Sequence, residues 1–284
     1  MDFVYFLGRF HVLALHIPIG VIMAVALLEI LARYQPRFAS LKAASPYLWG
    51  VAAASAIATV VLGFMHYTEG GFDGPSVPKH MFFGVVVAVV ATVGFAMALK
   101  AEQLFAKAAV PLSVALVVLV SITGHYGGNL THGSTYLVEY APQFIRSMHG
   151  LEPRRARVTD LATADPYLDV IKPLTDLRCL SCHNDDRRRG ELSMVDHESL
   201  MSGGEFLPVI VPYAPDASSF IQRISLPEDD DDFMPADGNT PLTERQTQIF
   251  AWWVAAGAPA GVTFAEIELD PEAEALIRAE LGLE

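Results

Sequence analysis

The chain has 284 residues, of which 52% are hydrophobic, and its formal net charge is −13. Only six of its 32 acidic residues precede Leu151, so the negative charge belongs almost wholly to the second half, and such an acidic surface argues against nucleic acid as a partner. The two cysteines share one short motif, which excludes the disulfide framework of a small secreted domain.

Four apolar stretches in the first half approach or exceed the length that a helix needs to cross a bilayer, about 17 to 25 residues. They run roughly over residues 10–31, 48–65, 81–99 and 108–123. The first contains only Glu29, near its far end, and the third and fourth contain no charge. Their length and periodicity predict a four-helix transmembrane bundle within residues 1–132.

The loops predict the orientation of this bundle, because Lys and Arg are retained on the cytoplasmic side of short loops. Arg33, Arg37 and Lys42 separate the first two stretches, and Lys100 and Lys107 separate the last two. We therefore expect both termini on the periplasmic side of a bacterial inner membrane. The N-terminus lacks the basic region and cleavage site of a removable signal peptide, so the first span should remain in the mature protein.

Six histidines belong to this half, and in the predicted orientation all six fall on the outer side. Ionisable residues in or beside membrane spans are costly, which makes them functional candidates, and histidines on facing helices can hold a haem between them. We expect one or two haem b groups here; the alternative is that interfacial histidines cap helices or pair with lipid headgroups. The best candidate ligands are His16, His66, His80 and His125, and the secondary candidates are His11 and His132.

The spacing of His11 and His16 limits how they can be used. Five residues place them about 140° apart around a helix and about 7.5 Å apart along it, so they cannot simply bind one iron. This leaves two sites, or one ligand and one hydrogen-bonding residue. Tyr126, Tyr136 and Tyr140 either line a quinol pocket near the outer leaflet or belong to an interfacial aromatic belt.

Three segments of this half carry a resemblance to a known family. They are residues 7–11 (LGRFH), 16–19 (HIPI) and 124–133 (GHYGGNLTHG). They resemble an uncharacterised bacterial family of four-helix membrane domains, over about residues 5–140. The resemblance implies the fold and no particular activity.

Prolines and arginines predict a partly ordered connector over residues 133–165, and the motif that carries the chemistry follows it. In Cys179-Leu180-Ser181-Cys182-His183, both thiols can reach haem vinyl groups from one helical turn, and the adjacent histidine can bind iron. This spacing predicts one covalently attached haem c. A redox dithiol or half a zinc site are the alternatives, but a thioredoxin-like context and a second cysteine pair are missing. Covalent attachment is a periplasmic process, which agrees with the predicted orientation.

A sixth iron ligand is expected far downstream of His183, on a loop that covers the other face of the haem. A thioether there would raise the reduction potential. Met234, followed by Pro235, is the best candidate, and Met194 and Met201 are competitors that lie closer to the attachment motif.

Charged runs near these residues allow two interpretations each. The acidic residues 228–232 either steer a basic redox partner toward the haem edge or form a solvated loop. Arg187, Arg188 and Arg189 either pair with haem propionates or are ordinary surface charges.

The flanking segments predict helices. Asp165 should cap a helix that Pro173 kinks or restarts, and residues 243–256 should form a closing helix that carries Trp252 and Trp253.

An ordered series of short motifs supports the same domain. After Cys179 it comprises residues 190–192 (GEL), 202–204 (SGG), 209–212 (VIVP), 217–219 (ASS), 233–235 (FMP), 241–243 (PLT), 252–253 (WW) and 257–258 (GA). It resembles the planctomycete-type cytochrome c domain over about residues 167–260. The resemblance implies a small, mostly helical fold in which His183 and Met234 bind the iron. Tyr213 departs from it, because a glycine is expected there.

The sequence thus predicts an all-α protein with a transmembrane bundle (1–132), a connector (133–165), a cytochrome c domain (166–262) and a tail with a short helix (263–284). The leading hypothesis is a membrane-anchored cytochrome that transfers electrons in the periplasm, embedded in membrane lipids and joined to redox protein partners in a multi-subunit respiratory complex. A second hypothesis is a quinol-oxidising enzyme that feeds haem c. In a third, the membrane half is only an anchor and assembly surface.

Overall fold

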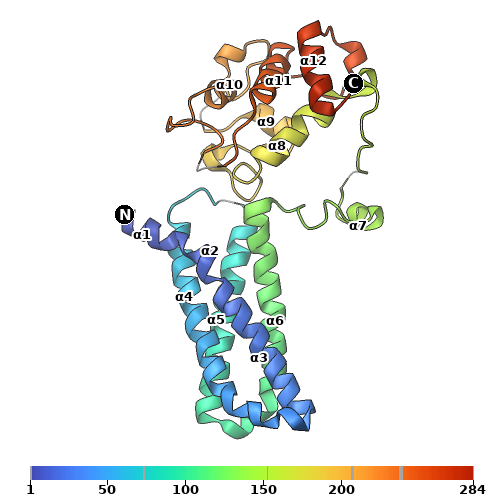
Figure 1. Ribbon diagram of the computed structural model, residues 1–284. Helices are drawn as coiled ribbons and strands as arrows, with labels where there is room; N and C mark the ends of the chain where they lie inside the picture. The colour runs from blue at the N-terminus through green and yellow to red at the C-terminus, as the bar shows by residue number, and fades with distance from the viewer. Residues whose placement is uncertain (1, 73, 152, 206–207, 237–238, 284) are drawn as a thin grey trace. The chain divides into compact units, whose positions relative to one another are not determined.

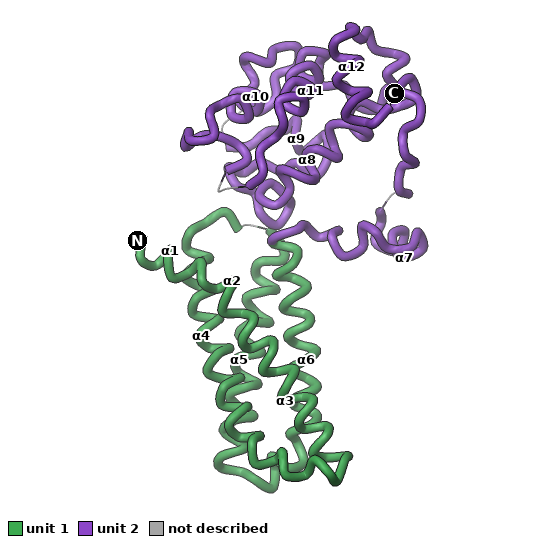
Figure 2. Tube along the Cα trace, in the orientation of Figure 1, with its two compact units in different colours: residues 1–130 green, residues 131–284 purple. Residues whose placement is uncertain are grey.

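The structure is a computed structural model that describes residues 2–72, 74–151, 153–205, 208–236 and 239–283. Within these ranges the structure contains helices and no strands (Figure 1), which confirms the all-α prediction. The chain divides into two compact units, residues 1–130 and residues 131–284 (Figure 2). Each unit is described by itself.

The first unit is a bundle of four long helical segments. Its helices are α1 (Asp2–Arg9), α2 (His11–Ala14), α3 (His16–Tyr34), the 3-10 helix η1 (Pro36–Ala44), α4 (Ser45–Tyr67), α5 (Ser76–Lys100) and α6 (Glu102–His132). Residues 2–34, 36–67, 76–100 and 102–132 are each long and apolar enough to cross a membrane. The helices extend beyond the apolar stretches of the sequence because their polar and glycine-containing ends remain helical.

The core of this bundle consists mainly of small side chains around the rings of Trp49 and Phe105. Trp49 is completely buried, and Gly94 of α5 lies against it, because a Cβ at Gly94 would overlap the indole ring. Close helix approach at small residues is the usual packing of membrane bundles. Glu29 of α3 is buried as well, and it accepts hydrogen bonds from Ser45 and from Trp49 Nε1 (3.1 Å).

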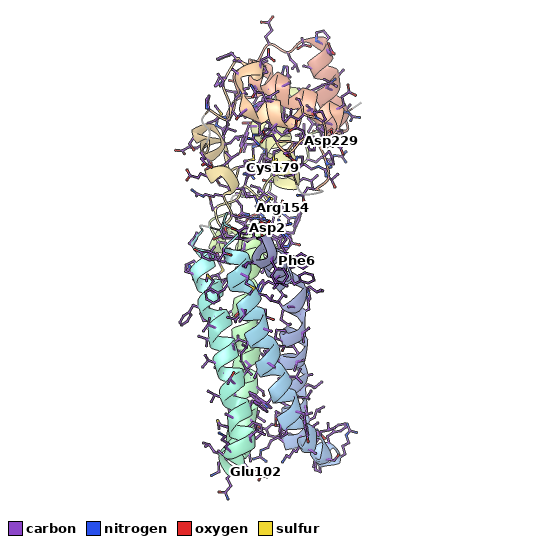
Figure 3. The ribbon with its side chains drawn as sticks, turned by 90° about the vertical axis from the view of Figure 1, so that its left-hand side faces the viewer. Asp2, Phe6, Glu102, Arg154, Cys179 and Asp229 are labelled. Carbon is purple, nitrogen blue, oxygen red and sulfur yellow. The ribbon has the colours of Figure 1, made fainter. Side chains whose placement is uncertain are left out.

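The direction of the helices places the histidine-rich segments together. Asp2 and Phe6 lie at one end of the bundle, and Glu102, which begins α6, lies at the other (Figure 3). The end of α4, the beginning of α5 and the end of α6 therefore lie at the same end as α1 and α2.

The second unit contains shorter helices around a separate core. They are α7 (Gln143–Met148), η2 (Leu161–Thr163), the π-helix η3 (Pro166–Ile171), α8 (Lys172–Arg178), η4 (Arg189–Glu191), α9 (His197–Ser202), η5 (Pro215–Ala217), α10 (Ser219–Ile224), α11 (Glu244–Ala255), η6 (Phe264–Glu266) and α12 (Pro271–Leu281). Ile171, Leu200, Phe250 and Trp253 are fully buried and belong to one hydrophobic cluster.

The beginning and end of this unit are tied together by Asp165. Its Oδ1 accepts the amides of Tyr167 (2.8 Å) and Leu168 (2.9 Å), which caps η3, and its Oδ2 accepts the amide of Gly261 (2.8 Å). The helix changes from π to α geometry at Lys172, next to Pro173. Proline cannot donate a backbone hydrogen bond, which explains a change of helix type here.

Two further local features bear on the sequence predictions. Thr243 caps α11 and forms a capping box with Gln246, so the closing helix begins where its sequence predicts. Tyr213 has a φ of 65°, in the left-handed region that favours glycine. The chain thus adopts at Tyr213 the conformation for which a glycine was expected.

Candidate functional site

A cavity of about 220 Å³ lies in the second unit beside the Cys-x-x-Cys-His turn. Cys179, Cys182, His183 and Met234 all line it, so the structure brings together the four residues that the sequence assigned to one site. The rest of the wall is mainly apolar and includes Leu192, Met194, Val209, Phe220, Ile224 and Leu242. Figure 3 shows Cys179 among the short helices of this unit.

The motif forms one tight turn after α8. The amide of Cys179 donates to the carbonyl of Thr175 (2.8 Å), and the amides of Cys182 (3.1 Å) and His183 (3.0 Å) both donate to the carbonyl of Cys179. Within this turn, Cys179, Cys182 and His183 all line the same cavity. The turn therefore supplies two attachment points and one iron ligand from five consecutive residues.

The state of the thiols argues against a redox dithiol. Burial, together with the nearby Asp176 carboxylate, raises the pKa of the Cys179 thiol to about 12. A reactive dithiol needs a lowered thiol pKa. A zinc site also lacks ligands, because the described ranges contain no group of three or more His, Cys, Asp and Glu side chains that could hold a metal ion.

Burial favours the neutral imidazole of His183. Burial lowers the pKa of His183, and the backbone carbonyls of Leu192 and Arg189 act in the opposite direction. Its Nδ1 atom is buried and makes no hydrogen bond of normal geometry to the described residues. A neutral imidazole is the form that binds iron.

The three candidate methionines occupy different places. Met234 lines the cavity, and its amide donates to the carbonyl of Arg223 (3.2 Å). Met194 is 2% exposed and also lines the cavity, but its amide donates to the carbonyl of His183 (2.8 Å), so it belongs to the segment that carries the histidine. Met201 packs against the core.

Arginines surround part of the cavity. Arg189 lines it, whereas Arg188 pairs with Asp185 (3.0 Å). Arg178 and Arg223 line it too, and the sequence reasoning did not single them out, although Arg178 directly precedes the motif. Arg178 Nε is buried and has no hydrogen-bond partner within the described part of the chain. A carboxylate of a bound group would satisfy this donor.

The acidic run is close to the cavity in the structure. Residues 228–232 are all exposed, and Asp232 pairs with the cavity-lining Arg223 (2.9 Å). The ion pair between Asp232 and Arg223 therefore links the acidic run to a residue that lines the cavity.

The structure groups the membrane histidines differently from the ranking drawn from the sequence. The rings of His11 and His80 are paired, with centroids 6.1 Å apart and planes at 90°. His66 instead contacts Glu69 (3.2 Å), and its ring lies 5.1 Å from that of Phe72.

The other three membrane histidines are exposed. His16 contacts the carbonyl of Leu13 in its own segment (3.3 Å), and the His132 ring stacks on Tyr136 at 4.4 Å. The His125 ring lies 5.4 Å from the ring of Tyr126. None of these contacts joins one of them to another membrane histidine.

The three tyrosines of the predicted quinol pocket belong to different units. Tyr126 of α6 stacks on Phe83 (6.0 Å, 10°), and the Lys79 ammonium lies 5.4 Å from its ring centre. Tyr136 and Tyr140 belong to the second unit and are 52% and 75% exposed.

A small helical domain in which a Cys-x-x-Cys-His turn and a distant methionine line one apolar cavity has the arrangement of a c-type cytochrome. Residues 179–238 match the family model described as planctomycete cytochrome C. The match includes the motif and Met234, and it is shorter than the resemblance over residues 167–260. It identifies a cytochrome c domain, which implies haem c and points to electron transfer.

The remaining comparisons add no further relative. No curated protein and no solved structure matches the chain. The resemblance of the first half to an uncharacterised membrane family is not supported by a family match.

Proposed function

We propose that the chain is a membrane-anchored c-type cytochrome that transfers electrons on the periplasmic side of the inner membrane. The observation that carries this proposal is the single cavity lined by Cys179, Cys182, His183 and Met234. The four apolar helical segments would anchor it. The positively charged loops at 33–42 and 100–107 favour an orientation with both termini outside.

The residues that line the cavity would have different roles in binding the haem. Both cysteines would hold the haem through thioether bonds, and His183 and Met234, from separate segments, would bind its iron. Arg178 would donate to a propionate through its buried Nε. Bound haem supplies one-electron chemistry, and the apolar walls exclude water, which together with a thioether ligand favours a high reduction potential.

The exposed acidic residues 228–232 support a positively charged redox partner. Their connection to Arg223 places them at the rim of the cavity, where a complementary partner would be steered to the haem edge.

We further propose that haem b is bound in the membrane half and that the chain is one subunit of a larger respiratory complex. Membrane lipids would surround the four spans.

A second candidate function is quinol oxidation by the membrane half. The observation that favours it is the aromatic group formed by Tyr126 and Phe83 beside Lys79 and His125. Reduction of haem c by added quinol in the purified chain would support it. Failure with ubiquinol, menaquinol and plastoquinol would refute it and leave the membrane half as an electron carrier or an anchor.

The proposal is tested on the full chain, produced in a bacterium with haem c attachment machinery and purified in detergent. A denaturing gel stained for haem should show a haem band at the mass of the chain. The band should disappear when both Cys179 and Cys182 are replaced by Ala. A wild-type chain without covalent haem would contradict the proposed function.

A further inference from the structure

Two histidines of the membrane bundle make the same contact with the backbone of a neighbouring helix. His11 Nδ1 lies 2.9 Å from the carbonyl oxygen of Thr59 in α4. His80 Nδ1, on α5, lies 3.0 Å from the carbonyl oxygen of Thr123 in α6. A carbonyl oxygen only accepts hydrogen bonds, so each Nδ1 carries the proton, and the neutral form of each ring has its lone pair on Nε2. Nε2 is thus the nitrogen of each ring that remains available to a metal.

A glycine makes each of these contacts possible. Gly63 follows Thr59 by four positions, and Gly127 follows Thr123 by four positions. A Cβ at Gly63 would lie 3.0 Å from Cε1 of His11, and a Cβ at Gly127 would lie 3.0 Å from Cε1 of His80. In a helix the carbonyl of one residue points toward the residue four positions later. The missing side chain therefore gives the imidazole access to the second lone pair of that carbonyl.

The arrangement occurs twice, once in each successive pair of long helices. A histidine near the beginning of one helix reaches a Thr-x-x-x-Gly segment near the end of the next, over sequence separations of 48 and 43 residues. A hydrogen bond from Nδ1 to a backbone carbonyl is one of the common ways in which a protein fixes the tautomer of a metal-bound histidine.

The distance between the two rings fits one shared iron. With a bond of about 2.0 Å from each Nε2 to a metal, and about 1.1 Å from each Nε2 to its ring centre, two imidazoles on opposite sides would have centroids about 6.2 Å apart. The observed separation is 6.1 Å. The hydroxyl of Thr59 is buried beside this pair without a hydrogen-bond partner among the described residues, which adds a polar group to the site.

The number of ligands at the His11–His80 pair indicates whether a bare metal ion or a haem would bind there. A bare transition metal ion needs about four ligands, but no third His, Cys, Asp or Glu of the described residues joins the pair in a metal-binding group. A haem needs only two axial ligands, because its porphyrin supplies the others. We propose that His11 and His80 are the two axial ligands of a haem b, and that Gly63 and Gly127 are the positioning residues that allow both imidazoles to reach their carbonyls.

This inference rests on the proposed haem b and changes its ligand set. Of the four best candidates from the sequence, only His80 remains an iron ligand, with the secondary candidate His11 as its partner. His16 and His125 are exposed, and their contacts within the described residues are with the carbonyl of Leu13 and the ring of Tyr126, not with the pair. They are therefore matched control positions.

The experiment measures haem b and haem c separately in the full chain, purified in detergent from cells with haem c attachment machinery. Acid acetone extracts haem b, and covalent haem c stays with the protein as an internal standard. His11→Ala and His80→Ala should each lose the extractable haem b and keep haem c, whereas His16→Ala and His125→Ala should keep both. Added imidazole should restore haem b binding in the His80→Ala variant.

The glycines have their own control. Gly63→Ala and Gly127→Ala should lower the haem b content and change the low-spin electron paramagnetic resonance signal of the ferric b haem. Gly124→Ala should change neither, because a Cβ at Gly124 meets nothing within 4 Å. These variants test geometry without removing a ligand.

The outcomes distinguish the inference from the proposed function. Haem b that survives in both His11→Ala and His80→Ala would overturn the ligand assignment and leave a membrane haem elsewhere. A wild-type chain with haem c and no haem b, or with a porphyrin-free metal ion at this pair, would overturn the inference and leave the haem c function intact. Loss of haem c itself would contradict the proposed function.

Discussion

Replacing Met234 by Ala separates iron binding from packing, because Met194 provides a control in the same cavity. Met234→Ala should abolish the near-infrared charge-transfer band of a methionine bound to ferric haem. Met234 is only partly buried, so the loss of packing should cost about 1 to 2 kcal/mol, below the range for a fully buried methionine. Met234→His should instead give a spectrum of two histidines and a lower reduction potential.

Met194→Ala should have the opposite effect, a larger loss of stability without a change in iron binding. Met194 is 2% exposed and belongs to the core, so its truncation should cost about 3 kcal/mol. For a unit of this size that loss lowers the melting temperature by about 6 to 12 °C. The melting temperature is measured from the Soret absorbance on heating. The near-infrared band should remain. A band that survives in Met234→Ala, or that disappears in Met194→Ala, would refute the assignment.

Three further predictions concern the second unit. Replacing Cys179 or Cys182 alone by Ala should leave haem attached through one thioether, which shifts the pyridine haemochrome maximum to longer wavelength; an unchanged maximum would contradict the predicted double attachment. Thr243→Ala should destabilise the unit by about 1 kcal/mol, measured by denaturant unfolding, since it removes the cap of α11. The pKa of Glu266 is lowered by hydrogen bonds from the backbone and side chain of Thr263. The stability that these hydrogen bonds contribute is present above the ordinary pKa of Glu, and it is lost as the pH falls through the lowered pKa. The difference in stability between wild type and Glu266→Ala should therefore shrink on acidification, and a constant difference from pH 7 to pH 3 would disprove the capping role.

The fold was largely predictable because its signals are local. A long apolar stretch can satisfy its backbone in a bilayer only as a helix or a closed barrel, and the structure has helices at all four predicted spans. Capping residues are equally local, so Asp165 and Thr243 mark helix starts in the sequence and in the structure. Tyr213 shows the limit, since its left-handed conformation would be expected of glycine.

The haem c cavity was predictable in its central residues and less so in its wall. The spacing of Cys179, Cys182 and His183 follows from the chemistry of attachment, whereas the wall depends on how distant segments pack. Arg178 and Arg223 were missed for this reason.

The proposed membrane site was the least predictable part. A ranking of histidines by position along the helices cannot see which backbone carbonyls are accessible, and those carbonyls distinguish His11 from His16. The signal that could have found the pair is the repeated Thr-x-x-x-Gly spacing at Thr59 and Thr123, which becomes meaningful once each segment is known to face a histidine.

The most direct test of the proposed function is the mass of the denatured full chain, produced with the haem c attachment machinery and analysed intact and after proteolysis. The full chain should carry the added mass of one haem, on the peptide that contains Cys179 and Cys182. A chain whose two thiols remain unmodified would contradict it.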